Sequence, residues 1–138
     1  MVIALIAAVL AAASPVSPLP LAELPPQPLG LSECALVLWE RATGRRVAML
    51  LARPGGIRVF SGGSIRNLPE IAADGDAVVG FVPHARFGDA ALQVETSLAI
   101  TASDAAGSAI VRDGAITVTG ADGMAVVAPV AGIAGCGG

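Results

Sequence analysis

The most regular pattern in the chain is an alternation of apolar and polar positions between Ala91 and Ala102. The positions of one parity are Leu92, Val94, Thr96, Leu98 and Ile100, and those between them are polar or small. A period of two places the two sets on opposite faces of a strand. The sequence therefore predicts a long strand over 91–102, with one face buried and the other in water.

Short apolar runs separated by turn residues predict further strands from Cys34 onward. Asp113–Gly114 and Asp122–Gly123 each lie between two such runs, and Asp-Gly is a strong signal for a hairpin turn. The best helical candidate, 68–73, is too short for more than one or two turns. We predict an all-β fold, a small antiparallel β-sandwich or barrel of about seven or eight short strands. The other predicted strands are 34–40, 47–52, 57–60, 77–82, 109–112, 115–119 and 124–130.

The first two predicted strands are apolar on both faces. In 34–40, Val37 and Trp39 share one face with Ala35, while leucines occupy the other. A strand in contact with water on one side alternates apolar and polar residues, so these two strands should be central or covered by a partner. Val37 and Trp39 are accordingly candidate interface residues.

The first 33 residues have a different composition. Val2 to Ala13 is an unbroken apolar run, too short to cross a bilayer but suited to a signal peptide, although no Lys or Arg follows Met1. We expect cleavage after Ala13, or after Ser17. Six of the ten prolines follow before residue 29. The predicted organisation is a signal peptide over 1–13, a proline-rich extended spacer over 14–33, and one all-β domain over 34–138.

Cys34 and Cys136 are the only cysteines. In an exported protein an even pair predicts a disulfide, here closing a loop of about a hundred residues. All eight basic residues are Arg, which suggests a GC-rich bacterial genome. We expect a periplasmic or extracellular protein with no transmembrane span in the mature chain. We do not expect a membrane barrel, because most of the predicted strands are too short and the sequence lacks the aromatic residues that form girdles at the membrane interfaces.

The net charge of −3 is unfavourable for a nucleic-acid-binding protein. The arginines are nevertheless concentrated before residue 67. They form a candidate patch for phosphate, acidic glycan or lipid headgroups, or else a solvated face balanced by glutamates. Arg58, between the apolar Ile57 and Val59, should point outward. The candidate binding residues are Arg41, Arg45, Arg53 and Arg58.

Candidate catalytic chemistry is sparse. His84 is the only histidine, and Asp89 could orient it, but no nucleophile motif accompanies them. Two cysteines and one histidine fall short of a zinc site, and the Asp-Gly pairs lack calcium-binding spacing, so we expect no cofactor. The leading expectation is a non-enzymatic cell-envelope module that binds a partner protein or an anionic envelope component. The alternatives are a structural subunit of an envelope complex and a small hydrolase or lyase using His84 and Asp89.

Overall fold

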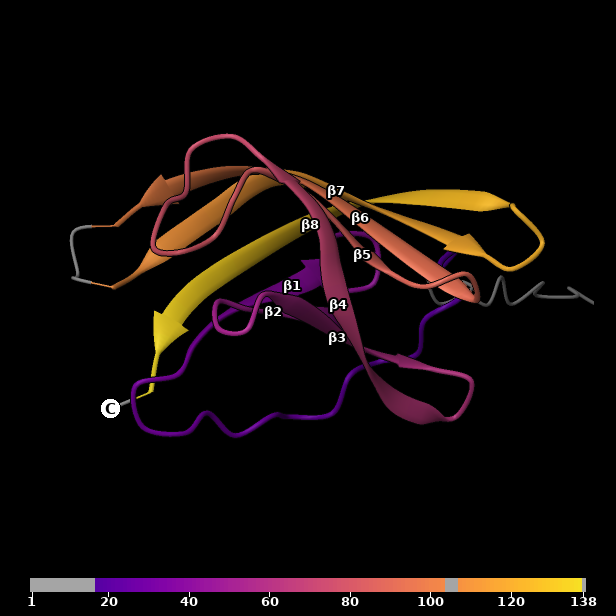
Figure 1. The fold of residues 1–138 in the computed structure, drawn as a ribbon, viewed down its shortest axis with the longest axis horizontal. Coiled ribbons are helices and arrows are strands. Elements are labelled where there is room, and N and C mark those ends of the chain that lie inside the picture. The colour runs from indigo at the N-terminus through magenta and orange to yellow at the C-terminus, as the bar shows by residue number, and fades with distance from the viewer. Residues whose placement is uncertain (1–16, 104–106, 138) are drawn as a thin grey trace, which may run out of the picture.

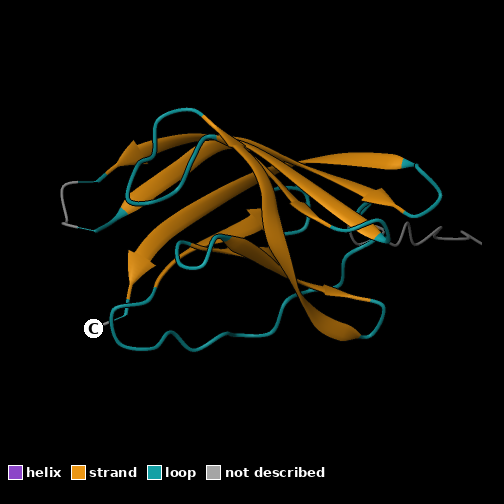
Figure 2. Ribbon diagram, in the orientation of Figure 1, coloured by secondary structure: helices purple, strands orange, loops and turns teal. Residues whose placement is uncertain are grey.

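The described part of the chain is built from β-strands. The computed structural model describes residues 17–103 and 107–137, and every regular element in them is a strand, drawn in orange in Figure 2. The prediction of an all-β fold is confirmed. The strands are β1 (Cys34–Glu40), β2 (Arg46–Leu51), β3 (Gly56–Ser61), β4 (Ser64–Asp74), β5 (His84–Gly88), β6 (Leu92–Ala102), β7 (Ala109–Gly120) and β8 (Ala125–Cys136).

These strands form a closed antiparallel barrel. Each strand pairs with the next in sequence, and β8 returns to pair with β1. Figure 1 shows the first and last strands, in indigo and yellow, side by side. The sequence left a sandwich and a barrel open, and the continuous ring of hydrogen-bonded strands decides for the barrel. Among the described residues there is no helix long and apolar enough to cross a membrane.

The alternation predicted over 91–102 is confirmed in β6. Its inward side chains from Leu92 to Leu98 are buried, and the residues between them are exposed. The inward residues of the other strands join them in one hydrophobic cluster. An eight-stranded barrel encloses a space that side chains just fill, so this cluster is the core of the molecule.

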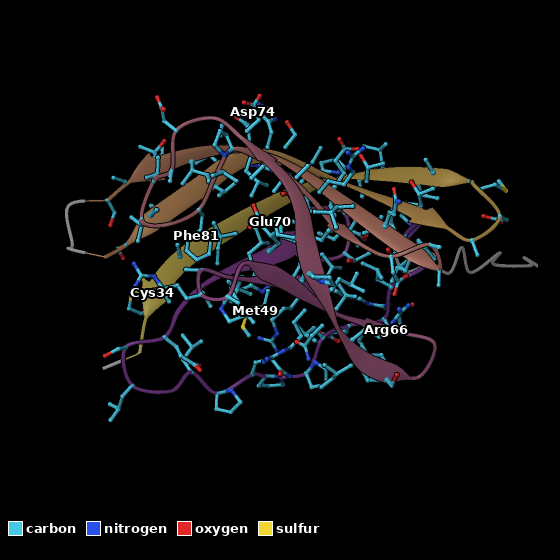
Figure 3. All side chains as sticks on the ribbon, in the orientation of Figure 1. Cys34, Met49, Arg66, Glu70, Asp74 and Phe81 are labelled. Atoms are coloured by element: carbon cyan, nitrogen blue, oxygen red, sulfur yellow. A yellow bond between two sulfur atoms is a disulfide. The ribbon has the colours of Figure 1, made fainter. Side chains whose placement is uncertain are left out.

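The strand predicted over 77–82 is wrong. These residues lie in the loop between β4 and β5, where Val78 and Phe81 form only an isolated bridge. Phe81, labelled in Figure 3, is buried in the same cluster as the barrel interior. A cavity of about 60 Å³ beside it is lined by Leu50 and Phe87, among others. The apolar run therefore reflects a loop that covers one end of the barrel.

Two other segments are strands where the sequence predicted something else. Residues 68–73, the best helical candidate, lie in β4, and His84, predicted in a loop, is the first residue of β5. A single apolar turn cannot sustain a helix on its own. β5 instead gains hydrogen-bonding partners on both sides, since it pairs with β4 and with β6.

Asp113–Gly114 is not a hairpin turn, contrary to the prediction. β7 continues through it, and the register with β8 shifts between Val111 and Gly114, which marks a β-bulge. A Cβ atom on Gly114 would lie 2.8 Å from Cδ2 of Leu98, so glycine allows the close packing inside the barrel. Asp122–Gly123 does lie in the turn between β7 and β8, and Gly123 has a φ of 80°.

Residues 17–29, which we call the N-terminal strap, lie against the outside of the barrel. Figure 1 shows this segment running beneath β1, β2 and β3. Leu24 is fully buried and packs with Ala35 of β1 and Met49 of β2, and Figure 3 shows Met49 on the side of β2 that faces the strap. The outer face of the first two strands, predicted to be central or covered by a partner, is covered by the chain's own N-terminal strap.

The beginning of the N-terminal strap is joined to one end of the barrel. Leu19 and Leu21 belong to the core cluster. The hydroxyl of Ser17 donates a hydrogen bond to the carboxylate of Glu40, the last residue of β1. Glu40 is fully buried and also accepts a hydrogen bond of 2.9 Å from the hydroxyl of Thr43. The predicted signal peptide lies outside the described residues.

The predicted disulfide between Cys34 and Cys136 is present. The two residues are direct partners in the register of β1 and β8, and they are 102 positions apart in the sequence. The bond therefore fastens the pair of strands that closes the barrel. Figure 3 labels Cys34 at this end of the molecule.

Candidate functional site

Because side chains fill the barrel interior, a ligand would have to bind on the outer surface of the barrel or at one of its ends. Four hollows of about 250 to 350 Å³ lie among the described residues, on outer faces of strands or at the ends of the barrel. Each of the four is lined by one arginine. The hollow over β2, β3 and β4 has the most apolar lining of the four and no acidic residue in it, so it is the strongest candidate.

We call this surface the Arg58 hollow. In the barrel register Leu51 of β2 is the partner of Gly56 of β3, which is also the partner of Pro69 of β4. A depression of about 350 Å³ lies over these three positions. The lining residues are Leu51, Pro54, Gly55, Gly56, Ile57, Arg58, Asn67, Leu68 and Pro69.

Arg58 is held at this hollow by neutral groups. Its Nε donates to Oδ1 of Asn67 at 2.8 Å, and its Nη1 donates to Oε1 of Gln27 in the N-terminal strap at 3.1 Å. The ion pairs among residues 17–103 and 107–137 do not include Arg58. Since a guanidinium has five N–H donors, this side chain retains donors and an uncompensated charge for an anion. The prediction that Arg58 points outward from β3 is confirmed by its buried neighbours.

The four arginines predicted as one patch are distributed over the molecule. Arg41 and Arg45 lie in the connection between β1 and β2, whereas Arg53 follows β2 at the opposite end of that strand. Arg41 is 3.9 Å from the carboxylate of Asp113 and donates to a backbone carbonyl of β8. Of the four, only Arg58 lines the Arg58 hollow.

Val37 and Trp39, the candidate interface residues, point outward from β1 and are half-buried. Their register partners on β8 are Ile133 and Ala131. Ile133 in turn is the partner of Ile110 on β7, and 55% of Ile133 is exposed. The structure thus places these residues on an apolar stripe over β7, β8 and β1.

His84 and Asp89 do not meet. His84 begins β5 and Asp89 follows its last residue, so the length of the strand separates them. The Oγ of Ser97, on the adjacent strand, lies 3.3 Å from Nδ1 of His84. Asp74 is the register partner of His84 on β4, and all three side chains are exposed. Charge developing there would be screened by water, so the arrangement gives the hydrolase alternative no support.

Asp89 has a structural environment of its own. Its Oδ1 accepts hydrogen bonds from the backbone N–H groups of Ala91 and Leu92, at 2.9 and 3.0 Å. Its Oδ2 forms an ion pair of 3.1 Å with Arg66. These backbone hydrogen bonds, and then the charge of Arg66, lower the pKa of the Asp89 carboxyl below its usual value of 3.8. The carboxylate therefore stabilises the turn between β5 and β6.

The sequence did not reveal the polar neighbours that hold Arg58 in place. Gln27 lies in a segment predicted as a spacer, and Asn67 lies just before the segment that was the best helical candidate. Their contacts with Arg58 depend on the position of the strap and on the pairing of β3 with β4, which the sequence did not predict.

Within the described ranges no three His, Cys, Asp or Glu side chains lie close enough together to bind a metal ion. Comparisons of the chain with protein-family models, curated proteins and solved structures find no match.

Proposed function

We propose that this protein is an exported, non-catalytic binding module of a bacterial cell envelope, and that the Arg58 hollow is its ligand site. The ligand is an anionic group, phosphate or carboxylate, carried on an apolar body. The observation that carries the proposal is a guanidinium without an acidic partner among the described residues, placed beside an apolar hollow.

The chemistry of the lining supports both parts of such a ligand. Arginine binds phosphate and carboxylate through two parallel N–H donors. Leu51 and Pro69 offer apolar surface on either side of Gly56, where an acyl chain or another apolar group would leave water. A free small anion would use Arg58 alone, whereas an amphiphile would use the whole hollow.

The disulfide supports the proposed location of the protein in the periplasm or outside the cell. Structural disulfides persist in oxidising surroundings such as the periplasm or the extracellular space, and Cys34–Cys136 joins two strands of the barrel. The apolar run over 2–13 is the sequence signal for export.

The test is a titration of the isotope-labelled full chain, followed by amide NMR. The probe is dihexanoyl phosphatidic acid below its micelle concentration, compared with dihexanoylglycerol and with inorganic phosphate. We expect the phosphatidic acid to shift the amides of Leu51, Gly56 and Arg58 and to bind more tightly than either comparison compound.

Matched arginine variants locate the site. Arg58→Gln should weaken binding of the phosphatidic acid at least tenfold, since a hydrogen bond to a charged group contributes about 1.5–3 kcal/mol. Arg86→Gln, on the outer face of β5, should leave it unchanged. Equal binding by Arg58→Gln and the wild type, equal binding of inorganic phosphate, or no binding of any probe would each overturn the proposal.

A structural subunit of a larger envelope complex is the second candidate. It is favoured by the apolar stripe over β7, β8 and β1, where Ile110 and Ile133 are exposed beside the half-buried Val37. Ile133→Asp should abolish stoichiometric co-purification of a partner from the native envelope while leaving the circular dichroism of the chain unchanged. Co-purification that survives this substitution would remove the stripe as the interface.

A further inference from the structure

The N-terminal strap occupies a gap between two strands of the barrel. β2 and β3 are register partners only from Met49 to Leu51 and from Gly56 to Arg58. Beyond that point the strap supplies the missing partner. The N–H of Ala22 donates to the carbonyl of Phe60 at 2.9 Å, and the N–H of Leu24 donates to the carbonyl of Arg46 at 2.8 Å.

Side chains reinforce this backbone pairing along the whole N-terminal strap. Arg46 returns a hydrogen bond of 2.9 Å from its Nε to the carbonyl of Leu24. Ser17 bonds the buried carboxylate of Glu40 at one end, and Gln27 bonds Arg58 at the other. The strap therefore has the features of a bound peptide ligand: buried apolar side chains, backbone hydrogen bonds and polar contacts at both ends.

The prolines should keep the N-terminal strap extended both when it is bound to the barrel and when it is released. Proline has no N–H donor and a fixed φ, and the prolines flanking the pairing residues are exposed. Ala22 and Leu24 are the residues whose N–H groups reach the barrel. A released proline-rich segment rises about 3.1 Å per residue, so thirteen residues would extend about 40 Å, enough to reach a neighbouring barrel.

The connection to β1 has the form of a hinge. It is a short turn in which the N–H of Gly30 donates to the carboxylate of Glu33 at 2.9 Å. Leu31 in this turn is 85% exposed, and Ser32 has a φ of 65°, a conformation that is unfavourable for residues other than glycine. The turn is also bonded to the residue after β8, since the N–H of Ser32 donates to the carbonyl of Gly137 at 3.1 Å and the N–H of Gly137 donates to the carbonyl of Glu33 at 2.8 Å. Straightening the turn would break these two hydrogen bonds but none between the eight strands, and it would let a detached strap swing away from the barrel.

We infer that the N-terminal strap can be exchanged between two copies of this chain, so that each strap fills the gap between β2 and β3 of its partner. A strap inserted into a second copy would make the same contacts there as it makes in its own chain, which is the condition for reciprocal exchange. An emptied gap would expose Met49, Ala35 and the carboxylate of Glu40, so a second strap is the occupant that matches both its apolar and its polar groups.

The experiment uses the full chain and a fluorescent peptide with the sequence of residues 17–29, which represents the strap of a second copy. The Leu24→Asp chain, whose own strap is disabled, should bind this peptide at least tenfold more tightly than the wild type does. The control chain, Met124→Asp, carries the same substitution at an exposed side chain outside both the strap and the hinge turn, and it should behave like the wild type. Light scattering of the wild type and of Met124→Asp should show a dimer at rising concentration, and Leu24→Asp should stay monomeric.

Three outcomes would overturn the inference. The first is no binding by a Leu24→Asp chain that keeps the wild-type circular dichroism, and the second is equal binding of a scrambled peptide of the same composition. If Leu24→Asp does not fold, hydrogen exchange of the wild type decides. Exchange of the Ala22 and Leu24 amides as slow as that of Val94 in β6 would show that the strap leaves only on global unfolding, whereas faster exchange supports the inference.

Discussion

Thr96 faces the barrel interior from the middle of β6, and its hydroxyl is buried without a hydrogen-bond partner among the described residues. A buried hydroxyl in this state costs about 1–3 kcal/mol, because it has lost its hydrogen bonds with water. The alternation in the sequence correctly placed Thr96 on the inward face, where the neighbouring inward residues Val94 and Leu98 are apolar.

Replacing Thr96 by valine, which has nearly the same shape, should stabilise the fold by about 1 kcal/mol, since it removes the unsatisfied group. The measurement is urea unfolding monitored by circular dichroism. Thr101→Val, an exposed position on the same strand, should change the free energy of unfolding by less than about 0.5 kcal/mol. A destabilised Thr96→Val would mean that the hydroxyl does find a partner in solution.

Asp89 should make stability depend on pH in the acid range. Its folded-state pKa is lowered, so the carboxylate stabilises the fold fully above its unfolded-state pKa of about 3.9. That contribution is lost as the pH falls through the lower folded-state value. Asp89→Asn should therefore unfold at lower urea than the wild type at pH 7, and the difference should shrink at pH 2. An NMR titration that places the Asp89 pKa at or above 3.8 would contradict this.

At the scale of elements, the sequence predicted strands well where one face is buried and the other is wet, as in β6. The prediction was wrong where an apolar run or a glycine had a role other than in a strand or a turn. Residues 77–82 are apolar because they cover an end of the barrel, and Gly114 is required by close packing with Leu98 and not by a turn. Neither reason is visible before the strands are assembled.

The N-terminal strap is the element that the sequence described least well. Its composition predicted an extended conformation, but not the burial of Leu24, because the receiving surface comes from strands that are paired only in the folded barrel. The outward direction of Arg58 was predicted correctly, but the other three arginines of the predicted patch lie beyond the ends of β2, away from the Arg58 hollow. Arginines that are close in sequence can lie at opposite ends of a strand, so their clustering in the sequence did not predict a patch.

Leu24→Ala should destabilise the protein by about 2–5 kcal/mol, the usual cost of truncating a fully buried leucine. Leu31→Ala, a few residues away but exposed, should stay within about 0.5 kcal/mol of the wild type. Thermal or urea unfolding measures both variants. Equal effects would show that the strap contributes little to the stability of the barrel.

For the whole molecule, the disulfide is the feature that the sequence predicted most directly. Two cysteines bracketing a domain have one possible intramolecular pairing, and the structure has it across β1 and β8. The chain-entropy model gives about 4–5 kcal/mol for a loop of this length.

The double variant Cys34→Ser, Cys136→Ser should therefore lose about 4–5 kcal/mol of unfolding free energy. Reducing the wild type with a thiol reagent should shift its urea midpoint to that of the variant, and the same reagent should leave the variant unchanged. Identical midpoints for the oxidised wild type and the variant would show that barrel closure does not depend on the covalent bond.

Pairing the first strand of the barrel with the last also affects how the chain folds. The contacts between β1 and β8 join residues up to 102 positions apart, and such distant contacts slow folding because a long loop must be closed first. Until β8 arrives, β1 is an open edge that can pair with other molecules. A chain interrupted before residue 125 would keep that edge exposed, and we expect such fragments to aggregate where the complete chain folds.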